Sequence, residues 1–491
     1  MKNKSFTGRR FEMERLEKIG KSGHADIIIV YGRRRVGKTE LIEQFFQKGI
    51  IFKFEGIQTD IKSRAQARQY QIDNCLNRLA EYLGNPLLSK VKCESWSEFF
   101  KLLDPVIHKQ KTVLYFEEIQ WLSNYNSEFL AELKPFWDDS WRHEKGLKLV
   151  ICGSSPSFIT GQMMGDRALY SRAQHEFHLK PFNLMEIKDF FRKLGNREVM
   201  LAQLTVGGIP EYLKMMKGGS SLLQALCEHS FFSNAYFYHE ARRIFVSSLS
   251  ENKHYRAIVE YLSKIPHAAR KDIQSFLKLK SGGTLTTMLD DLENLGFIEK
   301  YVPVHLEENS LVARYAVSDE YLNFYYKFIR PAGKKIEGGK FNANPMAGLP
   351  ASRFQKSLGF CFERWCMKNS GLFAGILGFD KIEYRAGAYF NRQAMKKEPG
   401  FQIDLMYVRA DHKILICEIK HYYQPADAGK IYRETARKRD LFFLTSNKYR
   451  NYTCELVLIT TEGLKSRDKE NQREYFDHVI TYDEIFNRMY W

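Results

Sequence analysis

The stretch GRRRVGKT, residues 32–39, has the spacing G-x-x-x-x-G-K-[ST] and decides the N-terminal fold. It follows the apolar run DIIIVY, residues 26–31, and precedes a helix-like stretch at 40–46, so it lies at a predicted strand-to-helix junction. Glycines let the backbone fold around a phosphate chain, so that successive N–H groups and the helix N-terminus face the anion. The motif therefore predicts that the following residues bind ATP: Gly32, Arg33, Arg34, Arg35, Val36, Gly37, Lys38 and Thr39.

Two residues of this loop have distinct predicted roles. Lys38 is expected to reach the β- and γ-phosphates, and the Thr39 hydroxyl is expected to coordinate Mg²⁺. A buried strand predicted over 111–116 ends in two adjacent acids, Glu117 and Glu118. Beside a phosphate-binding loop, one such carboxylate can hold the metal ion while the next orients or deprotonates the attacking water. We assign Glu117 to the metal and Glu118 to the water.

A third predicted strand, at 147–153, ends in Ser154. A small hydroxyl in that position can sense the γ-phosphate or the attacking water, although a serine after a strand is more often part of a turn. Ser154 is therefore a candidate catalytic residue only because of the motifs around it.

The motifs occur in an order that resembles the archaeal-type ATPase family of the AAA+ class: F-x-G-R-x-x-E from Phe6, then GRRRVGKT, FEEIQWL, ICGSS, ALYSR and GGIPEYL. The resemblance implies an ATPase core with a parallel sheet over residues 1–180 and a helical lid over 181–250. It also implies that Arg172, in ALYSR, is a sensor or an arginine finger. Family members usually have Asp where this chain has Glu117, which puts fast hydrolysis in question.

The middle of the chain, residues 251–330, has the pattern of a winged helix. Three short helical segments at 254–265, 269–279 and 284–295 precede two strand-like runs at 296–304 and 313–319. The third helix carries three acids, which phosphates would repel. Two roles therefore remain possible for this region, binding DNA and docking a protein partner. An aromatic run at 321–331 is expected to face the core, and residues 331–344 are predicted to be a linker.

The C-terminal region, residues 345–491, contains a second acidic pattern. A predicted hairpin places Asp404 on one strand and Glu418 with Lys420 on one face of the next. Two carboxylates that bind Mg²⁺ beside a lysine that positions water are suited to phosphodiester hydrolysis. This pattern resembles the α/β core of PD-(D/E)XK nucleases, in which a preceding helix often adds an acid, here Glu363. The basic stretch at 430–440 is expected either to bind along a phosphate backbone or to form a solvent-exposed helix face.

Composition favours a polyanionic partner. The formal net charge is +17 with a pI near 9.3, which points to nucleic acid, DNA or RNA. No signal peptide or membrane-span pattern is present, so we expect a cytoplasmic protein with no membrane association. The cysteines are scattered without metal-ligand spacing, which argues against a disulfide framework or a zinc site.

Together these patterns predict an ATPase whose nucleotide state gates a C-terminal metal-dependent nuclease. The alternative is an ATP-dependent nucleic-acid-binding or signalling switch with an inert nuclease fold, and without nucleic-acid binding a protein-partner ATPase would remain. Formation of a homo-oligomer is left open, because Arg172 needs a neighbouring subunit as a finger but not as a sensor.

Overall fold

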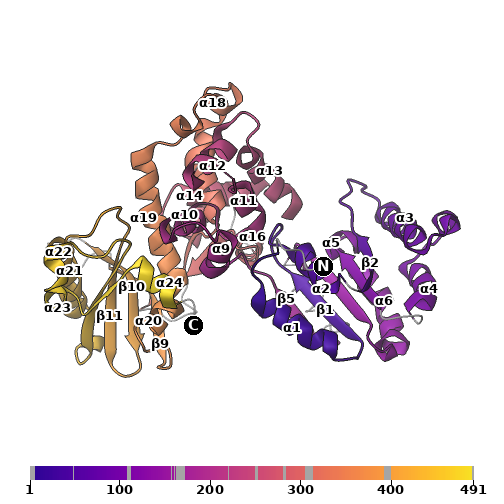
Figure 1. Ribbon diagram of the computed structural model, residues 1–491, viewed down its shortest axis with the longest axis horizontal. Coiled ribbons are helices and arrows are strands. Elements are labelled where there is room, and N and C mark those ends of the chain that lie inside the picture. Colours follow the sequence, from indigo (N-terminus) through magenta and orange to yellow (C-terminus); the bar gives the residue numbers. More distant parts are fainter. Residues whose placement is uncertain are drawn as a thin grey trace.

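The computed structural model has three bodies, a mostly helical one that lies between two others built on larger sheets (Figure 1). We call them the N-terminal domain, up to residue 178, the helical body, from 184 to 348, and the C-terminal domain, from 351 onward. The structure describes residues 6–47, 49–107, 112–155, 158–159, 161, 172–218, 221–248, 253–279, 283–304, 313–391 and 400–488.

The N-terminal domain is built on a parallel sheet in the order β2-β3-β4-β1-β5. Its strands are β1 (Asp26–Tyr31), β2 (Ile50–Glu55), β3 (Thr112–Glu117), β4 (Lys148–Gly153) and β5 (His175–His178). Every residue of β1, β3 and β4 is buried, as expected for parallel strands covered on both faces. The order places the carboxyl ends of β1, β4 and β3 side by side, which brings their motifs to one edge of the sheet.

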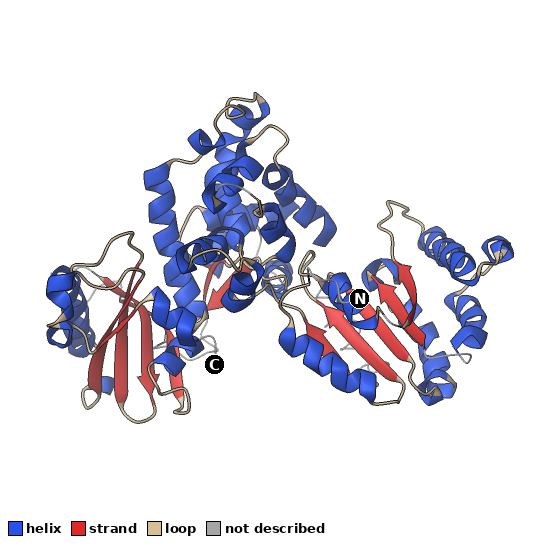
Figure 2. Ribbon diagram, viewed as in Figure 1, coloured by secondary structure: helices blue, strands red, loops and turns tan. Residues whose placement is uncertain are grey.

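Helices cover both faces of this sheet (Figure 2). The core residues of α1 (Arg10–Lys21) and α2 (Lys38–Phe46) pack with one face of β1. The other face packs against α3 (Arg64–Leu83), α4 (Trp96–Ile107), α5 (Ile119–Leu122) and α6 (Glu128–Asp139). Short 3₁₀ helices occur at Pro86–Lys90 and Trp141–His143.

The helical body begins with five helices: α9 (Leu184–Phe190), α10 (Asn196–Val206), α11 (Pro210–Met215), α12 (Leu222–Phe231) and α13 (Tyr236–Ser248). Then follow α14 (Lys253–Ser263), β6 (Ala268–Ala269), α15 (Arg270–Leu277), α16 (Thr284–Asn294), β7 (Ile298–Tyr301) and β8 (Arg314–Val317). The three strands form a small antiparallel sheet in the order β6-β8-β7. The predicted helices and strands are thus present, and β6 is an addition that the sequence pattern did not indicate.

The acids of α16 are mostly engaged within the helical body. Tyr255 donates a hydrogen bond of 2.5 Å to Asp291, and the Lys300 backbone N–H donates to Glu293 at 3.3 Å. Asp290 is exposed. Two of the acids of α16 therefore already have hydrogen-bond partners within the helical body.

The aromatic run after β8 forms α17 (Glu320–Phe324) and a π-helical turn at Tyr325–Ile329, and most of its aromatic side chains are buried as expected. Residues 331–344, predicted as a linker, are instead packed. They include the end of the 3₁₀ helix Arg330–Ala332 and α18 (Gly333–Glu337), and they bury Ile336 and Phe341. Glycine and lysine dominate this segment, but the two apolar side chains are enough to anchor it. A last 3₁₀ turn, Pro345–Gly348, leads to the C-terminal domain.

The C-terminal domain has one mixed sheet in the order β13-β12-β11-β10-β9. Strands β9 (Tyr384–Asn391), β10 (Phe401–Arg409) and β11 (Lys413–Lys420) pair antiparallel, whereas β11, β12 (Thr453–Thr460) and β13 (His478–Ile480) pair parallel. Side chains of α19 (Ala351–Lys368) pack on one face and those of α21 (Ala428–Thr445) on the other. Smaller elements are α20 (Ser370–Ile376), a 3₁₀ turn at Asn447–Tyr449, α22 (Ser466–Lys469), α23 (Gln472–Tyr475) and α24 (Tyr482–Arg488).

One continuous apolar core joins the three bodies. It runs from β1 through the helices of the helical body to α19 and the adjoining face of the C-terminal sheet. All eight cysteines are free thiols, and all but Cys454 are buried. No helix in the described ranges combines the length and apolarity that crossing a bilayer requires.

Candidate functional site

The loop at residues 32–39 curls around the start of α2 as its sequence predicts. Gly32 has a φ of +147°, and a side chain there would place its Cβ 2.2 Å from the Leu179 carbonyl oxygen. Gly37, at the N-cap of α2, has a φ of +89°. The Lys38 ammonium donates hydrogen bonds to the carbonyls of Gly32 and Arg33 at 3.0 and 3.1 Å. Phosphate oxygens can replace these carbonyls, because the ammonium already lies inside the curl of the loop.

The predicted metal residues Thr39 and Glu117 are in contact. The Thr39 hydroxyl donates a hydrogen bond to Glu117 Oε1. The Lys53 ammonium, from β2, lies 2.7 Å from Glu117 Oε2 and 3.0 Å from Glu43. Burial would lower the pKa of Lys53, but the two carboxylates outweigh it and raise the pKa to about 12. A hydroxyl and a carboxylate are oxygen ligands of the kind that Mg²⁺ prefers, so the residues fit that ion.

Glu118 is held by two neutral donors. Ser154 Oγ donates to Glu118 Oε2 at 2.6 Å, and Gln120 Nε2 donates to the same oxygen at 2.7 Å. Gln120 also donates to Ser154 at 3.1 Å. Since Glu118 itself adopts a left-handed backbone conformation, φ 51°, its carboxylate is positioned by both backbone and neighbours. Ser154 therefore touches Glu118 rather than lining the cavity.

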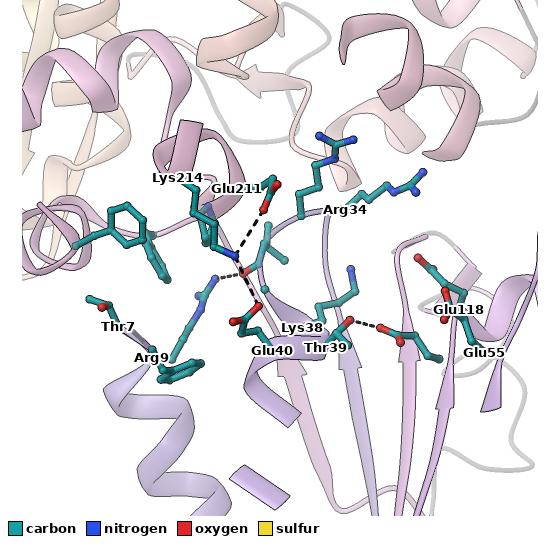
Figure 3. Close-up of a pocket in the computed structure, with 18 of the residues that line it drawn as sticks. Thr7, Arg9, Arg34, Lys38, Thr39, Glu40, Glu55, Glu118, Glu211 and Lys214 are labelled. Atoms are coloured by element: carbon teal, nitrogen blue, oxygen red, sulfur yellow. Dashed lines mark hydrogen bonds and ion pairs between the residues drawn. The ribbon is translucent and has the colours of Figure 1, made fainter. Parts of the chain in front are cut away.

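A cavity of about 530 Å³ extends from this edge of the sheet (Figure 3). Lys38, Thr39 and Glu118 line one side, and Thr7 and Arg9 line the other. The Arg9 guanidinium donates to the Val36 carbonyl at 2.6 Å, so the segment before α1 is bonded to the loop itself. Helix α11 contributes Pro210, Glu211 and Lys214, which places the predicted lid motif at the cavity.

Gly208, in the GGIPEYL motif, lies against Phe182. A Cβ on Gly208 would be 1.9 Å from the Phe182 carbonyl oxygen, and the Phe182 N–H donates to the Gly208 carbonyl at 2.7 Å. The motif therefore needs glycine because two backbone segments meet there.

Arg172 does not line the cavity. Its guanidinium forms a two-point ion pair with Asp138 on α6, with one contact of 2.8 Å. The structure thus does not bring Arg172 to the site as a sensor, while a role as a finger toward a neighbouring subunit stays a prediction. The preceding residues of ALYSR lie outside the described ranges.

Two arginines of the loop form ion pairs with the helical body, and one of them, Arg35, also lines the cavity. Arg33 forms a buried ion pair with Asp319, the N-cap of α17, and its guanidinium lies 5.3 Å from the Phe297 ring centroid. Arg35 lies 2.9 Å from a carboxylate oxygen of Glu240 on α13, and Glu240 is fully buried. The Arg33 side chain is thus engaged by Asp319, while binding of phosphate by the Arg33 backbone stays a prediction. Nothing in the sequence around Asp319 or Glu240 marks these acids as partners of the loop arginines.

The predicted C-terminal residues also meet. Asp404 lies at a β-bulge in β10, between Ile403 and Met406, where the ladder to β9 shifts register. Bulges re-aim side chains, and here Asp404 is close enough to Glu363 of α19 and Glu418 of β11 for their charges to interact. Burial and the Asp404 charge raise the pKa of Glu363 to about 8, and burial and Glu418 raise the pKa of Asp404 to about 6.

Two lysines neutralise Glu418. Lys420 Nζ lies 2.6 Å from Glu418 Oε1, and Lys438 Nζ donates to Oε2 at 2.8 Å. Lys438 comes from α21, and sequence reasoning missed it because that helix was expected to face phosphate or solvent. In the described residues, no three His, Cys, Asp or Glu side chains are grouped to hold a metal ion. Mg²⁺ commonly uses one or two carboxylates with waters, so Asp404 and Glu418 still fit it.

Comparison with known proteins identifies the N-terminal region. Residues 6–216 match the family model described as an ATPase domain predominantly from Archaea. This region therefore resembles an archaeal-type ATPase domain. It contains the loop, both acids after β3 and the lid motif, and it is the part of the chain to which the AAA+ resemblance applies.

Similar proteins extend beyond the ATPase domain. An uncharacterized protein of Methanocaldococcus jannaschii is 25% identical over 472 residues, which cover 95% of this chain and 97% of its own. An uncharacterized ATP-binding protein of the same organism is 50% identical over 42 residues, 9% of this chain and 71% of its own. Among solved structures, the Walker-type ATPase of Pyrococcus abyssi is 19% identical with a TM-score of 0.48, covering 66% of this chain and 96% of that one.

Proposed function

We propose that the protein is an ATPase whose nucleotide state controls a metal-dependent phosphodiesterase site, acting on DNA or RNA, in the C-terminal domain. The observation that carries this proposal is a single helical segment, residues 319–329, that contacts both sites. Asp319 at its start pairs with Arg33 of the ATP-binding loop. Asn323 and Lys327, further along, line a cavity that also contains Glu363 and Asp404.

At the ATPase site, the residues divide the work of phosphoryl transfer. Lys38 binds the β- and γ-phosphates, and Thr39 with Glu117 holds Mg²⁺, which neutralises charge on the phosphates when bound. Glu118 orients the attacking water and accepts its proton, and Ser154 and Gln120 fix its carboxylate at 2.6 and 2.7 Å. A longer acid than the usual Asp at position 117 fits because Thr39 and Lys53 bond it directly.

At the C-terminal site, the chemistry is phosphodiester hydrolysis. Asp404 and Glu418 would hold Mg²⁺, which would polarise a phosphate oxygen. Lys420 positions the attacking water or stabilises charge that develops on the phosphate, since its ammonium lies beside Glu418. The raised pKa values of Glu363 and Asp404 support a functional cluster, because unrelieved repulsion between buried acids is costly to keep for structure alone.

Coupling between the two sites would run through the arginines of the loop. A loop that closes on phosphates changes its backbone, and Arg33 and Arg35 transmit that change to Asp319 and Glu240. Since Asp319 caps α17, its movement shifts the helix that carries Asn323 and the turn that carries Lys327. The π-helical turn is consistent with this role, as such turns are frequent at functional sites.

A second candidate is a switch that binds nucleic acid through its winged-helix-like region and C-terminal domain without cutting it. The specific observation in its favour is the neutralisation of Glu418, 1% exposed, by both Lys420 and Lys438. A cation would have to compete with two ammonium groups for this carboxylate. In this version, ATP would still reorganise residues 319–329, but the outcome would be a change in the affinity of the protein for nucleic acid.

The deciding experiment is cleavage of labelled single- and double-stranded DNA and RNA with Mg²⁺ or Mn²⁺, with and without ATP. Wild type should cut, Asp404→Ala should not, and Lys38→Ala should lose the ATP dependence. Asp411→Ala is the matched control, because Asp411 lies in the turn of the same hairpin and pairs with Arg409. Intact substrates under every condition, with salt-dependent binding retained, would favour the switch over the nuclease.

A further inference from the structure

Two hollows meet at Glu363. One is a cavity of about 320 Å³ between the helical body and the C-terminal domain, which we call the aromatic pocket. The other is an open groove of about 890 Å³ along α19, β11 and α21, which we call the lysine groove. Glu363 lines both, and Asp404 lines the aromatic pocket. The acidic cluster therefore stands at the junction of the two.

Aromatic rings from two bodies of the molecule line the aromatic pocket. His267 and Phe390 lie 5.1 Å apart between ring centroids, and Tyr301 lies 6.2 Å from His267 and 6.4 Å from Phe390. Phe360 of α19 also lines the pocket and is 54% exposed. Aromatic faces of this kind stack on bases of any sequence. The volume is near the lower end of the roughly 300–1,000 Å³ of small-ligand sites, which suits one nucleotide and excludes a duplex.

Positive charge lies where a phosphate chain would enter. Lys327 lines the aromatic pocket, mostly buried, and its pKa is lowered because burial disfavours the ammonium. Its hydrogen bond to Ser357 Oγ is long, 3.5 Å, and it forms no ion pair with a carboxylate in the described part of the chain. In the lysine groove, Lys356 and Lys430 are exposed and likewise lack an ion pair within that part.

We propose that the aromatic pocket binds the terminal nucleotide of a single strand whose phosphate backbone lies in the lysine groove. The strand would pass Glu363 and Asp404, so the phosphodiester next to its end would lie at the acidic cluster. If the proposed function holds, the substrate is a single-stranded end of DNA or RNA, and this part of the inference rests on the proposed function. The stacking itself can be tested without any cleavage.

The test uses short single strands that carry the fluorescent base 2-aminopurine at one position, mixed with the full-length protein in EDTA. Stacking on an aromatic ring quenches this base. We expect quenching when the base is at one terminus, little quenching at the central position, and none for a circular strand of the same sequence. DNA and RNA versions of each strand identify which of the two nucleic acids the pocket prefers.

Phe390→Leu should weaken binding of the linear strand by about 5- to 150-fold and abolish the terminal quenching. Phe276→Leu is the matched control, because Phe276 is an exposed ring on α15 that stacks on Tyr261 outside the pocket. His267→Ala provides a second variant in case Phe390→Leu folds poorly. Circular dichroism of each variant checks the fold.

The outcomes separate this inference from the proposed function. Equal quenching at every position, or equal binding of linear and circular strands, would overturn the terminal pocket even if the protein cuts nucleic acid. Terminal quenching that depends on Phe390 would support the pocket even if no cleavage is ever seen. The nuclease proposal alone would then fail.

Discussion

The acids of the ATPase site lie at the ends of parallel strands, whereas those of the C-terminal cluster lie on adjacent strands and a covering helix. Glu118 receives hydrogen bonds from Ser154 and Gln120, which are neutral. Glu363 and Asp404 are instead buried near other carboxylates, and burial together with that repulsion raises their pKa values to about 8 and about 6. The first site thus holds one carboxylate in a fixed position. In the second, buried acids lie close together, and a bound cation or proton lowers the repulsion between them.

The largest effect should come from Glu118→Gln. If Glu118 accepts the proton of the attacking water, ATP hydrolysis should fall about 10²- to 10⁴-fold while ATP binding is retained. Steady-state phosphate release and nucleotide-binding titrations measure the two quantities. Glu55→Gln is the control, since Glu55 lines the same cavity. An equal loss in both variants would mean that Glu118 has no special role.

Asp319→Asn tests the connection between the sites. Asparagine keeps an oxygen to cap α17 but leaves the Arg33 guanidinium buried without its counter-ion. Removing one partner of a buried ion pair costs about 3–5 kcal/mol, so chemical denaturation should show a loss of that order. The exposed Asp290→Asn should change stability by less than about 0.5 kcal/mol. A neutral result at Asp319 would break the proposed link.

The C-terminal cluster should make stability fall as pH rises. The pKa of Glu363 is raised from 4.5 to about 8, so between these values the folded protein keeps a proton that the unfolded chain releases. Without divalent cations, unfolding free energy should drop by on the order of 1–3 kcal/mol from pH 5 to pH 8. Glu363→Gln should flatten this slope, as measured by urea denaturation at several pH values. An unchanged slope would show that Glu363 is not the titrating group.

The smallest effect is expected at Lys53. Lys53→Met removes the ammonium that lies 2.7 Å from Glu117, so Glu117 becomes a stronger ligand for Mg²⁺. The Mg²⁺ concentration for half-maximal ATP hydrolysis should fall by about 2- to 5-fold, the scale of a partly exposed ion pair. Lys214→Met, at the lid side of the same cavity, should leave this concentration unchanged. A shift in the opposite direction would mean that Lys53 assists the phosphate.

The sequence predicted local features better than long-range ones. The loop at 32–39 and the acids after β3 are read from contiguous motifs, because a phosphate-binding turn and a buried strand each leave a continuous pattern. The roles of Arg33 and Lys438 could not be read that way. Their partners, Asp319 and Glu418, are set by tertiary packing, and an arginine in a phosphate motif or a lysine on a basic helix is normally expected to face phosphate or solvent.

The linker at 331–344 shows the same limit at the scale of a segment. Its composition has no helical period, yet Ile336 and Phe341 pack into the body, and no local pattern shows that a receiving surface exists. Asp404, by contrast, is predicted from the hairpin, although the bulge at its position in β10 left no sign in the sequence.

The buried thiols give the molecule an internal set of reporters. Cys75, Cys93 and Cys152 lie in the ATPase domain, Cys227 in the helical body, and Cys361, Cys366 and Cys417 in the C-terminal domain. A thiol reagent can reach each of them only after the surrounding core opens. Peptide mapping of the labelled sites over time would therefore give the order in which the three bodies unfold, and would show whether their shared core makes them open together.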